Sequence, residues 1–225
     1  MEHLNIAIDG PSGAGKSTIA KNVAKRLGIR YLDTGAMYRV IGLNAIREGV
    51  AFNDAESVAD LLIRSDVRVA FTEEGQREYL GDEDVTGLIR TEQVSDAASR
   101  ISVHPCVRIR LTEMQREIAH NYDVVMDGRE IGTNVLPDTP YKFFLTASAE
   151  ERARRRYEQL VAEGDRSASY EQVLKDVKIR DERDTTRAYM PLVVAPDAVV
   201  IDTSNMTIEE ATKALISHIP HGSEA

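Results

Sequence analysis

Short apolar runs alternate along the chain with longer stretches whose apolar residues recur every three or four positions. The runs predict strands at 4–8, 29–32, 124–127, 141–145 and 198–201. The periodic stretches predict helices at 18–27, 33–49, 107–120, 149–163, 170–187 and 208–216. Because five strands alternate with helices, we expect an α/β fold: a five-stranded parallel sheet with helices on both faces.

The pattern changes near residues 60–90. After a short helix at 57–64, alternating apolar residues at 67–71 predict a strand, Glu74 and Gly75 a turn, and the segments at 79–80 and Val85 two more short strands. This β-rich piece is too short to build its own core and must pack against the rest of the chain. A chain of 225 residues is therefore expected to be one domain with an insertion at about 60–90.

A phosphate-binding loop follows the first predicted strand and opens into the first predicted helix. Residues 10–17 match the pattern G-x-x-x-x-G-K-[ST], in which backbone N–H groups converge on phosphate oxygens. Lys16 is expected to reach the β- and γ-phosphates of ATP, and the Ser17 hydroxyl to bind Mg²⁺. The expected nucleotide-binding residues are Gly10, Pro11, Ser12, Gly13, Ala14, Gly15, Lys16, Ser17 and Thr18. The motif between a predicted strand and a predicted helix indicates that the α/β fold is of the P-loop NTPase type. The alternative is that residues 10–17 match the pattern by chance in a glycine-bearing turn.

Arginines outside this loop point to phosphoryl transfer, which needs cations around the spreading negative charge. Arg180, Arg183, Asp184 and Arg187 share one helix face. The alternative is a solvated face with an ion pair between Arg180 and Asp184. A second cluster on the preceding helix comprises Arg152, Arg154, Arg155 and Arg156, and a polar tip at 164–169, which includes Arg166, joins the two helices. We expect residues 150–170 to form a lid.

Two further positions at strand ends are candidates for chemistry. Asp127 ends a predicted strand and is a candidate ligand of Mg²⁺ through water, although it could instead accept backbone hydrogen bonds. Arg129 follows it, and Arg39 lies one turn into the helix after the second predicted strand.

Composition narrows the function classes. The formal net charge of −9 argues against a nucleic acid polymer as partner. Cys106 is the only cysteine, which excludes an intrachain disulfide and a cysteine-rich metal site. The five histidines lack metal-ligand spacing. Since no presequence precedes the first strand and no apolar run approaches the ~20 residues of a membrane span, we expect a cytoplasmic monomer with no membrane partner.

With these residues assembled, the chain resembles the bacterial cytidylate kinases of the nucleoside monophosphate kinase group. The shared motifs are I-D-G-P-S-G-A-G-K-S at 8–17, L-D-T-G-A-M-Y-R at 32–39, I-R-T at 89–91, A-A-S at 97–99, D-G-R at 127–129 and R-D-x-R-D-x-x-R at 180–187. The resemblance implies transfer of the γ-phosphoryl group from Mg·ATP to CMP or dCMP, in pyrimidine nucleotide metabolism. It also implies that 60–90 belongs to an enlarged monophosphate-binding subdomain.

The resemblance also assigns residue roles. Lys16, Arg129, Arg180 and Arg187 become the catalytic set. For the acceptor, Arg39, Arg129 and Arg187 would hold its phosphate, Ser99 and Arg108 would recognise cytosine, Arg180 and Asp184 would contact the ribose, and Thr34 and Tyr38 would line the pocket. The chain departs from the family pattern at Glu130, where the family commonly has Asp.

Three other functions are alternatives to a cytidylate kinase. A P-loop kinase for UMP, dTMP or a small alcohol such as shikimate would share the loop, and the sequence separates CMP from UMP poorly. A GTPase switch would carry an [NT]-K-x-D motif, which the chain lacks. A nucleotide-gated regulatory module would not need arginines for an acceptor. For a kinase we expect in-line transfer without a general base, because the attacking phosphate oxygen is already ionised near neutral pH.

Overall fold

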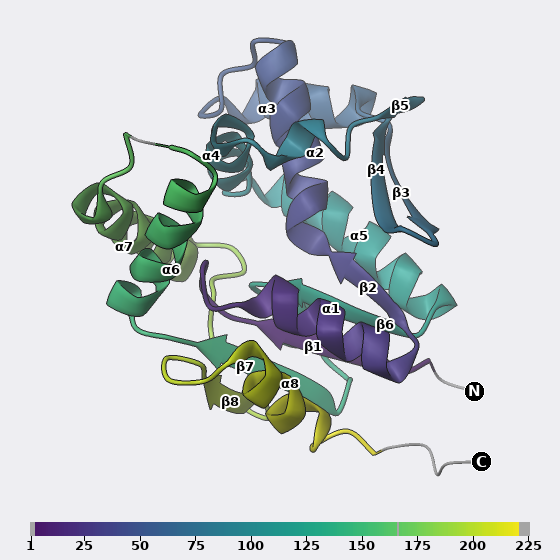
Figure 1. Ribbon diagram of the computed structural model, residues 1–225. Helices are drawn as coiled ribbons and strands as arrows, with labels where there is room; N and C mark the ends of the chain where they lie inside the picture. Colours follow the sequence, from purple (N-terminus) through teal and green to yellow (C-terminus); the bar gives the residue numbers. More distant parts are fainter. Residues whose placement is uncertain (1–2, 166, 221–225) are drawn as a thin grey trace. The chain divides into compact units, whose positions relative to one another are not determined.

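A computed structural model describes residues 3–165 and 167–220 (Figure 1). Arg166 of the predicted lid tip and the first two residues therefore lie outside the described residues. The chain divides into two compact units. Unit 1 comprises Met1–Leu4 and Arg30–Val124, and unit 2 comprises Asn5–Ile29 and Val125–Ala225.

Unit 2 is built from βα repeats. Its elements are β1 (Asn5–Asp9), α1 (Lys16–Leu27), β6 (Val124–Gly128), the π-helix η2 (Ile131–Val135), β7 (Tyr141–Thr146), α6 (Ala149–Ala162), α7 (Tyr170–Thr186), β8 (Val199–Asp202) and α8 (Ile208–Ile216). β1 pairs in parallel with β7, and β7 with β8, so that Ile8 lies opposite Phe143 and Phe143 opposite Val199. The side chains of Ile6, Ile8 and Phe143 are buried, as expected where helices cover a parallel sheet.

The helices of unit 2 form two pairs. α1 packs against α8, and α6 packs against α7 as a helical hairpin (Figure 1). With β2 (Arg30–Asp33), the strand order of the five-stranded sheet is β2-β6-β1-β7-β8. The predicted α/β fold with a five-stranded parallel sheet is therefore confirmed.

Unit 1 combines helices with a small antiparallel sheet. Its elements are β2 (Arg30–Asp33), α2 (Thr34–Arg47), α3 (Ala55–Arg64), β3 (Val67–Thr72), β4 (Gly75–Leu80), β5 (Glu83–Asp84), the 3₁₀-helix η1 (Leu88–Arg90), α4 (Glu92–Ile101) and α5 (Pro105–Asn121). β3, β4 and β5 follow one another in the antiparallel sheet. α2 and α4 approach closely at Gly42, where an added Cβ would lie 2.8 Å from the backbone N of Ala98. This close approach requires glycine.

Three local predictions differ from the structure. Val85 does not belong to a strand, because the third strand of the small sheet is Glu83–Asp84. The second strand begins at Gly75 rather than near Tyr79. Helix α4 was not predicted, although its buried residues Val94, Ala97, Ala98 and Ile101 recur at helical spacing, because two of the four are alanines and carry little hydrophobic signal. The assignment of 60–90 to a substrate-binding subdomain and of 150–170 to a lid concerns function and stays a prediction.

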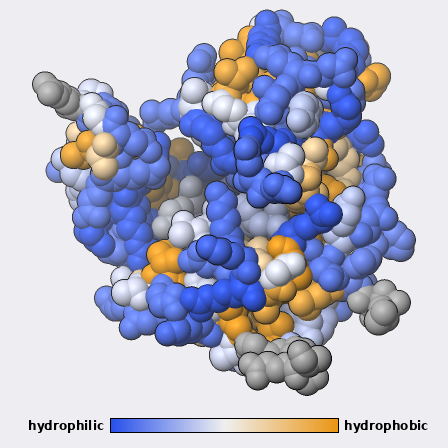
Figure 2. All heavy atoms as spheres, turned by 45° about the vertical axis from the view of Figure 1, so that its right-hand side comes forward, coloured by the Kyte–Doolittle hydropathy of each residue, from blue (hydrophilic) through white to orange (hydrophobic). Residues whose placement is uncertain are grey.

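Within residues 3–165 and 167–220, no helix combines the length and the apolar character that crossing a membrane would require. On the face seen in Figure 2, hydrophilic side chains predominate and hydrophobic ones form smaller patches.

Candidate active site

The phosphate-binding loop joins the end of β1 to the start of α1. Gly10 has φ 143°, and a Cβ at this position would lie 2.0 Å from the carbonyl oxygen of Leu145 on β7. Gly13 has φ 80°, and its Cβ would lie 3.0 Å from the Cβ of Arg152. Both positions exclude a side chain, so the loop is held close against β7 and α6. Successive backbone N–H groups of such a glycine-bearing turn can converge on an anion.

Lys16 lies inside this loop. Its side chain is buried, and its Nζ donates to the carbonyl of Pro11 at 2.7 Å. Burial, and then the positive charges of Arg129 and Arg180, lower the pKa of the Lys16 ammonium, whereas Asp127 acts in the opposite direction. A bound phosphate would offset both the burial and the repulsion, so this lysine is placed where an anion is electrostatically favoured.

Ser17 and Asp127, each predicted as a ligand of Mg²⁺, are hydrogen-bonded to one another. The Ser17 hydroxyl, on the first turn of α1, donates to Asp127 Oδ2 at the end of β6, over 2.9 Å. One hydroxyl and one carboxylate suit Mg²⁺, which commonly binds through one or two carboxylates together with substrate phosphates and water. In the described part of the chain, no group of three or more His, Cys, Asp or Glu side chains could hold a metal ion. The pair therefore fits only a metal ion that arrives with a nucleotide.

Asp184 on α7 organises two of the predicted catalytic arginines. Its Oδ2 accepts from Nε of Arg129 at 2.8 Å, and its Oδ1 accepts from Nη1 of Arg187 at 3.5 Å. Burial alone would raise the pKa of Asp184, but Arg129 and Arg180 outweigh it and hold the pKa below its usual value. The side chains of Asp184 and Arg187 are 9% and 5% exposed, so a solvated helix face is the wrong interpretation for these two residues.

Arg187 is fixed on three sides. Besides Asp184, it binds Glu130 Oε2 through Nη2 at 3.1 Å and the carbonyl of Met190 through Nε at 2.6 Å. Met190 has φ 51°, the one positive φ among the described residues other than glycine. Glu130, where the chain departs from the family pattern, thus carries a carboxylate that reaches a predicted phosphate-binding arginine.

Arg152, on the first turns of α6, connects three parts of unit 2. It binds both carboxylate oxygens of Asp181 on α7, at 2.9 and 2.6 Å, and the carbonyl of Ser12 in the phosphate-binding loop at 3.2 Å. A further bond from Nε reaches the carbonyl of Ala147 at 2.9 Å. The residue is 4% exposed. It therefore joins the loop to the α6–α7 hairpin.

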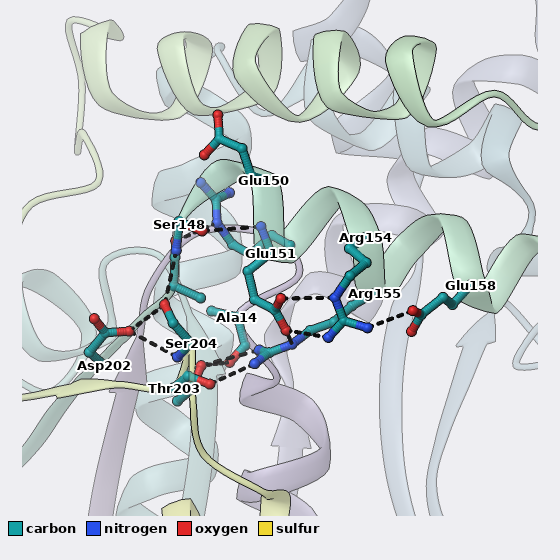
Figure 3. Close-up of polar contacts among 12 residues, drawn as sticks. Ala14, Ser148, Glu150, Glu151, Arg154, Arg155, Glu158, Asp202, Thr203 and Ser204 are labelled. Carbon is teal, nitrogen blue, oxygen red and sulfur yellow. Dashed lines mark hydrogen bonds and ion pairs between the residues drawn. The ribbon is translucent and has the colours of Figure 1, made fainter.

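The other arginines of α6 have different surroundings. Arg154 pairs at the surface with Glu151 and Glu158. Figure 3 shows Arg155 extending from α6 toward Thr203, whose carbonyl accepts at 2.6 Å and whose hydroxyl lies 3.2 Å from the carbonyl of Ala14. Arg156 has no hydrogen bond or ion pair with any other residue that the structure describes.

In unit 1, the predicted cytosine-binding residues meet around α2, α4 and α5. The Arg108 guanidinium lies over the ring of Tyr38, 5.4 Å from its centroid, and its Nε donates to the carbonyl of Ser102 at 2.6 Å. The Ser102 hydroxyl donates to the carbonyl of Ser99 at 2.9 Å. Arg108, Tyr38 and Ser99 therefore belong to one local cluster, although Ser99 joins it through Ser102.

Arg39 lies in a second cluster of unit 1. Asp33 caps α2 by accepting from the backbone N of Ala36 through Oδ1 at 3.0 Å. Its Oδ2 accepts from Arg39 at 2.7 Å and from Arg90 at 2.9 Å. Thr34, the first residue of α2, is buried. Arg39 is therefore positioned by a carboxylate at the end of its own helix.

Sequence reasoning missed several residues that hold the site together. Asp9 ends β1 and accepts from the backbone N of Ile131 and of Gly132 at 2.8 and 2.7 Å, so that it caps η2. Thr203 and Asp181 support Arg155 and Arg152 as described above. Asp9 and Thr203 come at the carboxyl ends of predicted strands, where ligands gather in parallel sheets, and that position was the available signal.

Known proteins of one family are similar to this chain over nearly its whole length. The profile of the family described as cytidylate kinase matches residues 6–221. The protein named cytidylate kinase in Carboxydothermus hydrogenoformans is 48% identical over 216 residues, covering 96% of this chain and 97% of its own. The cytidylate kinase of Pelotomaculum thermopropionicum is 49% identical over 219 residues, covering 97% and 96%.

One solved structure is similar in fold. An uncharacterized protein from Eubacterium ventriosum aligns over 96% of this chain and 98% of its own, with a TM-score of 0.51 and 15% identity. At this identity the likeness concerns the fold alone.

Proposed function

The chain belongs to the cytidylate kinase family, and from this premise we propose how its residues divide the work. The enzyme transfers the γ-phosphoryl group of ATP to CMP or dCMP, giving ADP and the corresponding diphosphate. One observation supports the division most directly: in unit 2, Lys16, Arg129 and Asp184 interact electrostatically beside the phosphate-binding loop. A kinase needs such a cationic, desolvated surrounding, because the charge of the transferred group spreads in the transition state.

The donor is bound by residues 10–18. Backbone N–H groups and the start of α1 hold the phosphates, and Lys16 exchanges its bond with Pro11 for the β- and γ-phosphate oxygens. Ser17 and Asp127, a hydroxyl and a carboxylate, would hold Mg²⁺, which would offset the charge of the phosphates.

The acceptor is bound by arginines that carboxylates already orient. In unit 2, Arg129 and Arg187, both fixed by Asp184, bind its phosphate, and Arg180 and Asp184 contact its ribose. In unit 1, we assign Arg39 to phosphate binding. A guanidinium has five donors, so each arginine can keep its carboxylate and still bind phosphate. Arg108, stacked on Tyr38, and Ser99 recognise cytosine through its ring acceptors and amino group.

The lid excludes water from the transferred group. Arg152 is committed to Asp181 and to the loop, and Arg154 and Arg155 are engaged with Glu151. Arg156 follows Arg152 by one helical turn on the same face, so we assign to Arg156 the contact with the transferred phosphoryl group. No general base is required, since the attacking oxygen belongs to an ionised phosphate. A monomeric, cytoplasmic enzyme stays our prediction.

ADP formation from Mg·ATP tests this function. The acceptors are CMP, dCMP, UMP, dTMP, AMP and none. We expect strong turnover with CMP and dCMP only. A preference for UMP would keep the phosphoryl-transfer scheme and overturn the cytosine-binding assignment of Ser99 and Arg108. Hydrolysis of ATP without response to any monophosphate would refute the kinase function.

A further inference from the structure

A cluster of four charged side chains surrounds the start of α2 in unit 1. Asp33, at 6% exposure, binds both Arg39 and Arg90 through the same oxygen. Burial alone would raise the pKa of Asp33, but Arg39 and Arg90 outweigh it and keep the pKa low. Asp33 is therefore a carboxylate with two cations. The fourth member, Glu78 on β4, makes the charge of the cluster variable.

The small sheet carries Glu78 to this cluster. Two residues before it on the same strand face, Gln76 accepts from the backbone N of Asp33 at 2.6 Å and donates to the carbonyl of Asp33 at 3.2 Å. Glu78 therefore faces α2 with Gln76, opposite Val69 on β3. It is 1% exposed. The charged groups that act on it come from β2 (Asp33), α2 (Arg39) and η1 (Arg90).

The hydrogen bonding of this cluster is incomplete. Both carboxyl oxygens of Glu78 are buried without a hydrogen-bond partner among the described residues, and so is Nε of Arg39. Burying an ionised carboxylate costs much free energy unless the carboxylate is paired, and burying a protonated carboxyl costs less. Burial raises the pKa of Glu78 to about 6, although Arg90 and Arg39 act to lower it. Glu78 thus changes charge close to neutral pH.

We propose that the protonation of Glu78 controls how strongly Arg39 binds the acceptor phosphate. With Glu78 protonated, one carboxylate faces two guanidinium groups and the cluster carries a net positive charge. With Glu78 ionised, two carboxylates face two guanidinium groups and the cluster is neutral. A phosphate is attracted more strongly to the first state. Glu78 is therefore a positioning residue, and this inference rests on the proposed role of Arg39.

The coupling must act in both directions. If protonated Glu78 favours acceptor binding, then bound acceptor favours protonated Glu78, so its pKa rises and the enzyme takes up protons on binding. The physical cause is that the phosphate offsets the positive charge of Arg39, which otherwise stabilises the Glu78 carboxylate. The affinity for acceptor then falls as pH rises through 6, because ionised Glu78 competes with the phosphate for Arg39.

The test compares the wild type with Glu78→Gln, a neutral side chain of the same shape. Calorimetry of CMP binding at pH 6.5 in two buffers of different ionisation enthalpy gives the proton uptake, and the KM for CMP is measured from pH 5.5 to 8. The phosphate of CMP exchanges the same protons on binding to either enzyme. The difference in proton uptake between the wild type and Glu78→Gln therefore reports the protonation of Glu78. For a pKa rise of about one unit on binding, we expect the KM of the wild type at pH 8 to exceed that of the variant by up to about tenfold. The KM values of the wild type and of Glu78→Gln should converge at pH 5.5.

A matched control is Glu83→Gln, which removes an exposed carboxylate from the same small sheet. It should keep the proton uptake and KM profile of the wild type. Equal proton uptake and parallel KM profiles for the wild type and Glu78→Gln would overturn the inference. If Glu78→Gln folds poorly, ¹³C NMR titration of the Glu78 carboxyl in the wild type replaces it. In that titration, a Glu78 pKa that stays unchanged when CMP is added would overturn the inference.

Arg39→Met separates this inference from the proposed function. A KM for CMP that stays unchanged in Arg39→Met would refute the phosphate-binding role of Arg39, and the inference with it. A raised KM in Arg39→Met, together with identical wild-type and Glu78→Gln profiles, would leave the proposed function in place and refute the role of Glu78 alone.

Discussion

Replacing Arg152 by methionine tests the connection between the phosphate-binding loop and the α6–α7 hairpin. The substitution keeps a long side chain but removes four hydrogen bonds, two to Asp181 and one each to the carbonyls of Ser12 and Ala147. Because Arg152 is 4% exposed, no water replaces the guanidinium at low cost.

The magnitude follows from the burial of the two partners. Breaking a buried ion pair by removing one side costs about 3–5 kcal/mol, since the remaining charge is left unpaired. The Asp181 side chain is 26% exposed, so water partly solvates its carboxylate after the substitution. We therefore expect Arg152→Met to lower the free energy of unfolding by about 2–3 kcal/mol, somewhat less than for a fully buried pair.

Urea denaturation of four proteins gives the answer: the wild type, Arg152→Met, Asp181→Leu and the double variant. Apolar replacement of both partners should restore most of the stability, which gives a coupling energy of about 1–3 kcal/mol. The control is Arg154→Met, whose side chain is 52% exposed and whose loss should cost at most about 0.5 kcal/mol. An Arg152→Met protein as stable as this control, or strict additivity in the double variant, would refute the reasoning.

The same four proteins separate a structural from a catalytic role for Arg152. If Arg152 only holds the loop, activity should return with stability in the double variant. A double variant that regains stability and stays inactive would show that the guanidinium itself acts on the phosphates.

The remaining predictions concern the loop, a buried acid and the acceptor arginine. Gly10→Ala places a Cβ 2.0 Å from the carbonyl of Leu145 and should weaken ATP binding more than tenfold, measured by calorimetry. Its control is Gly28→Ala, at φ 67° with no atom within 4 Å of the added Cβ, which should cost only about 1–2 kcal/mol of backbone strain and leave ATP binding unchanged. Burial raises the pKa of Asp9 from 3.8 to about 6. The stability that its protonated form contributes, up to ~3 kcal/mol, is present below pH 3.8 and lost as pH rises through 6. The free energy of unfolding of the wild type relative to Asp9→Asn should fall accordingly between pH 4 and 7.5, and a constant difference would contradict this assignment. Arg187→Met should lower kcat/KM for CMP by about 10²–10³ while ATP affinity stays within about twofold, which steady-state kinetics and calorimetry can separate.

The parts of the fold with strong periodicity could be predicted from the sequence. The helix at 208–216 was predicted to the residue, because a threonine cap and regular apolar positions mark it. Helix α4 was missed although Thr91 caps it and its apolar residues recur at helical spacing, because Ala97 and Ala98 carry little hydrophobic signal. These alanines lie where α2 approaches closely at Gly42. Such an approach is a tertiary contact, and a single sequence does not display it.

The site was predictable where a motif fixes the backbone. The G-x-x-x-x-G-K-[ST] pattern predicts the loop. Ser17 and Asp127 are each predicted as a ligand of Mg²⁺, but the hydrogen bond between them is not. The partners of the arginines were foreseen only in part. Helix spacing indicates that Asp184 lies near Arg180 and Arg187, and both act on its carboxylate. Its hydrogen bond to Arg129, at the end of β6, joins residues 55 positions apart, and helix spacing gives no sign of it.

Both units solve the same physical problem in the same way. An enzyme for highly charged substrates needs guanidinium groups in desolvated surroundings, but an unpaired buried cation is unfavourable. Here Asp184 pairs with two arginines of unit 2, and Asp33 pairs with Arg39 and Arg90 in unit 1. Each carboxylate stabilises the free enzyme, orients its arginines, and also lowers the charge available to a phosphate. Acceptor affinity therefore depends on the ratio of carboxylates to guanidinium groups in each cluster, and a titrating carboxyl among them makes that ratio depend on pH.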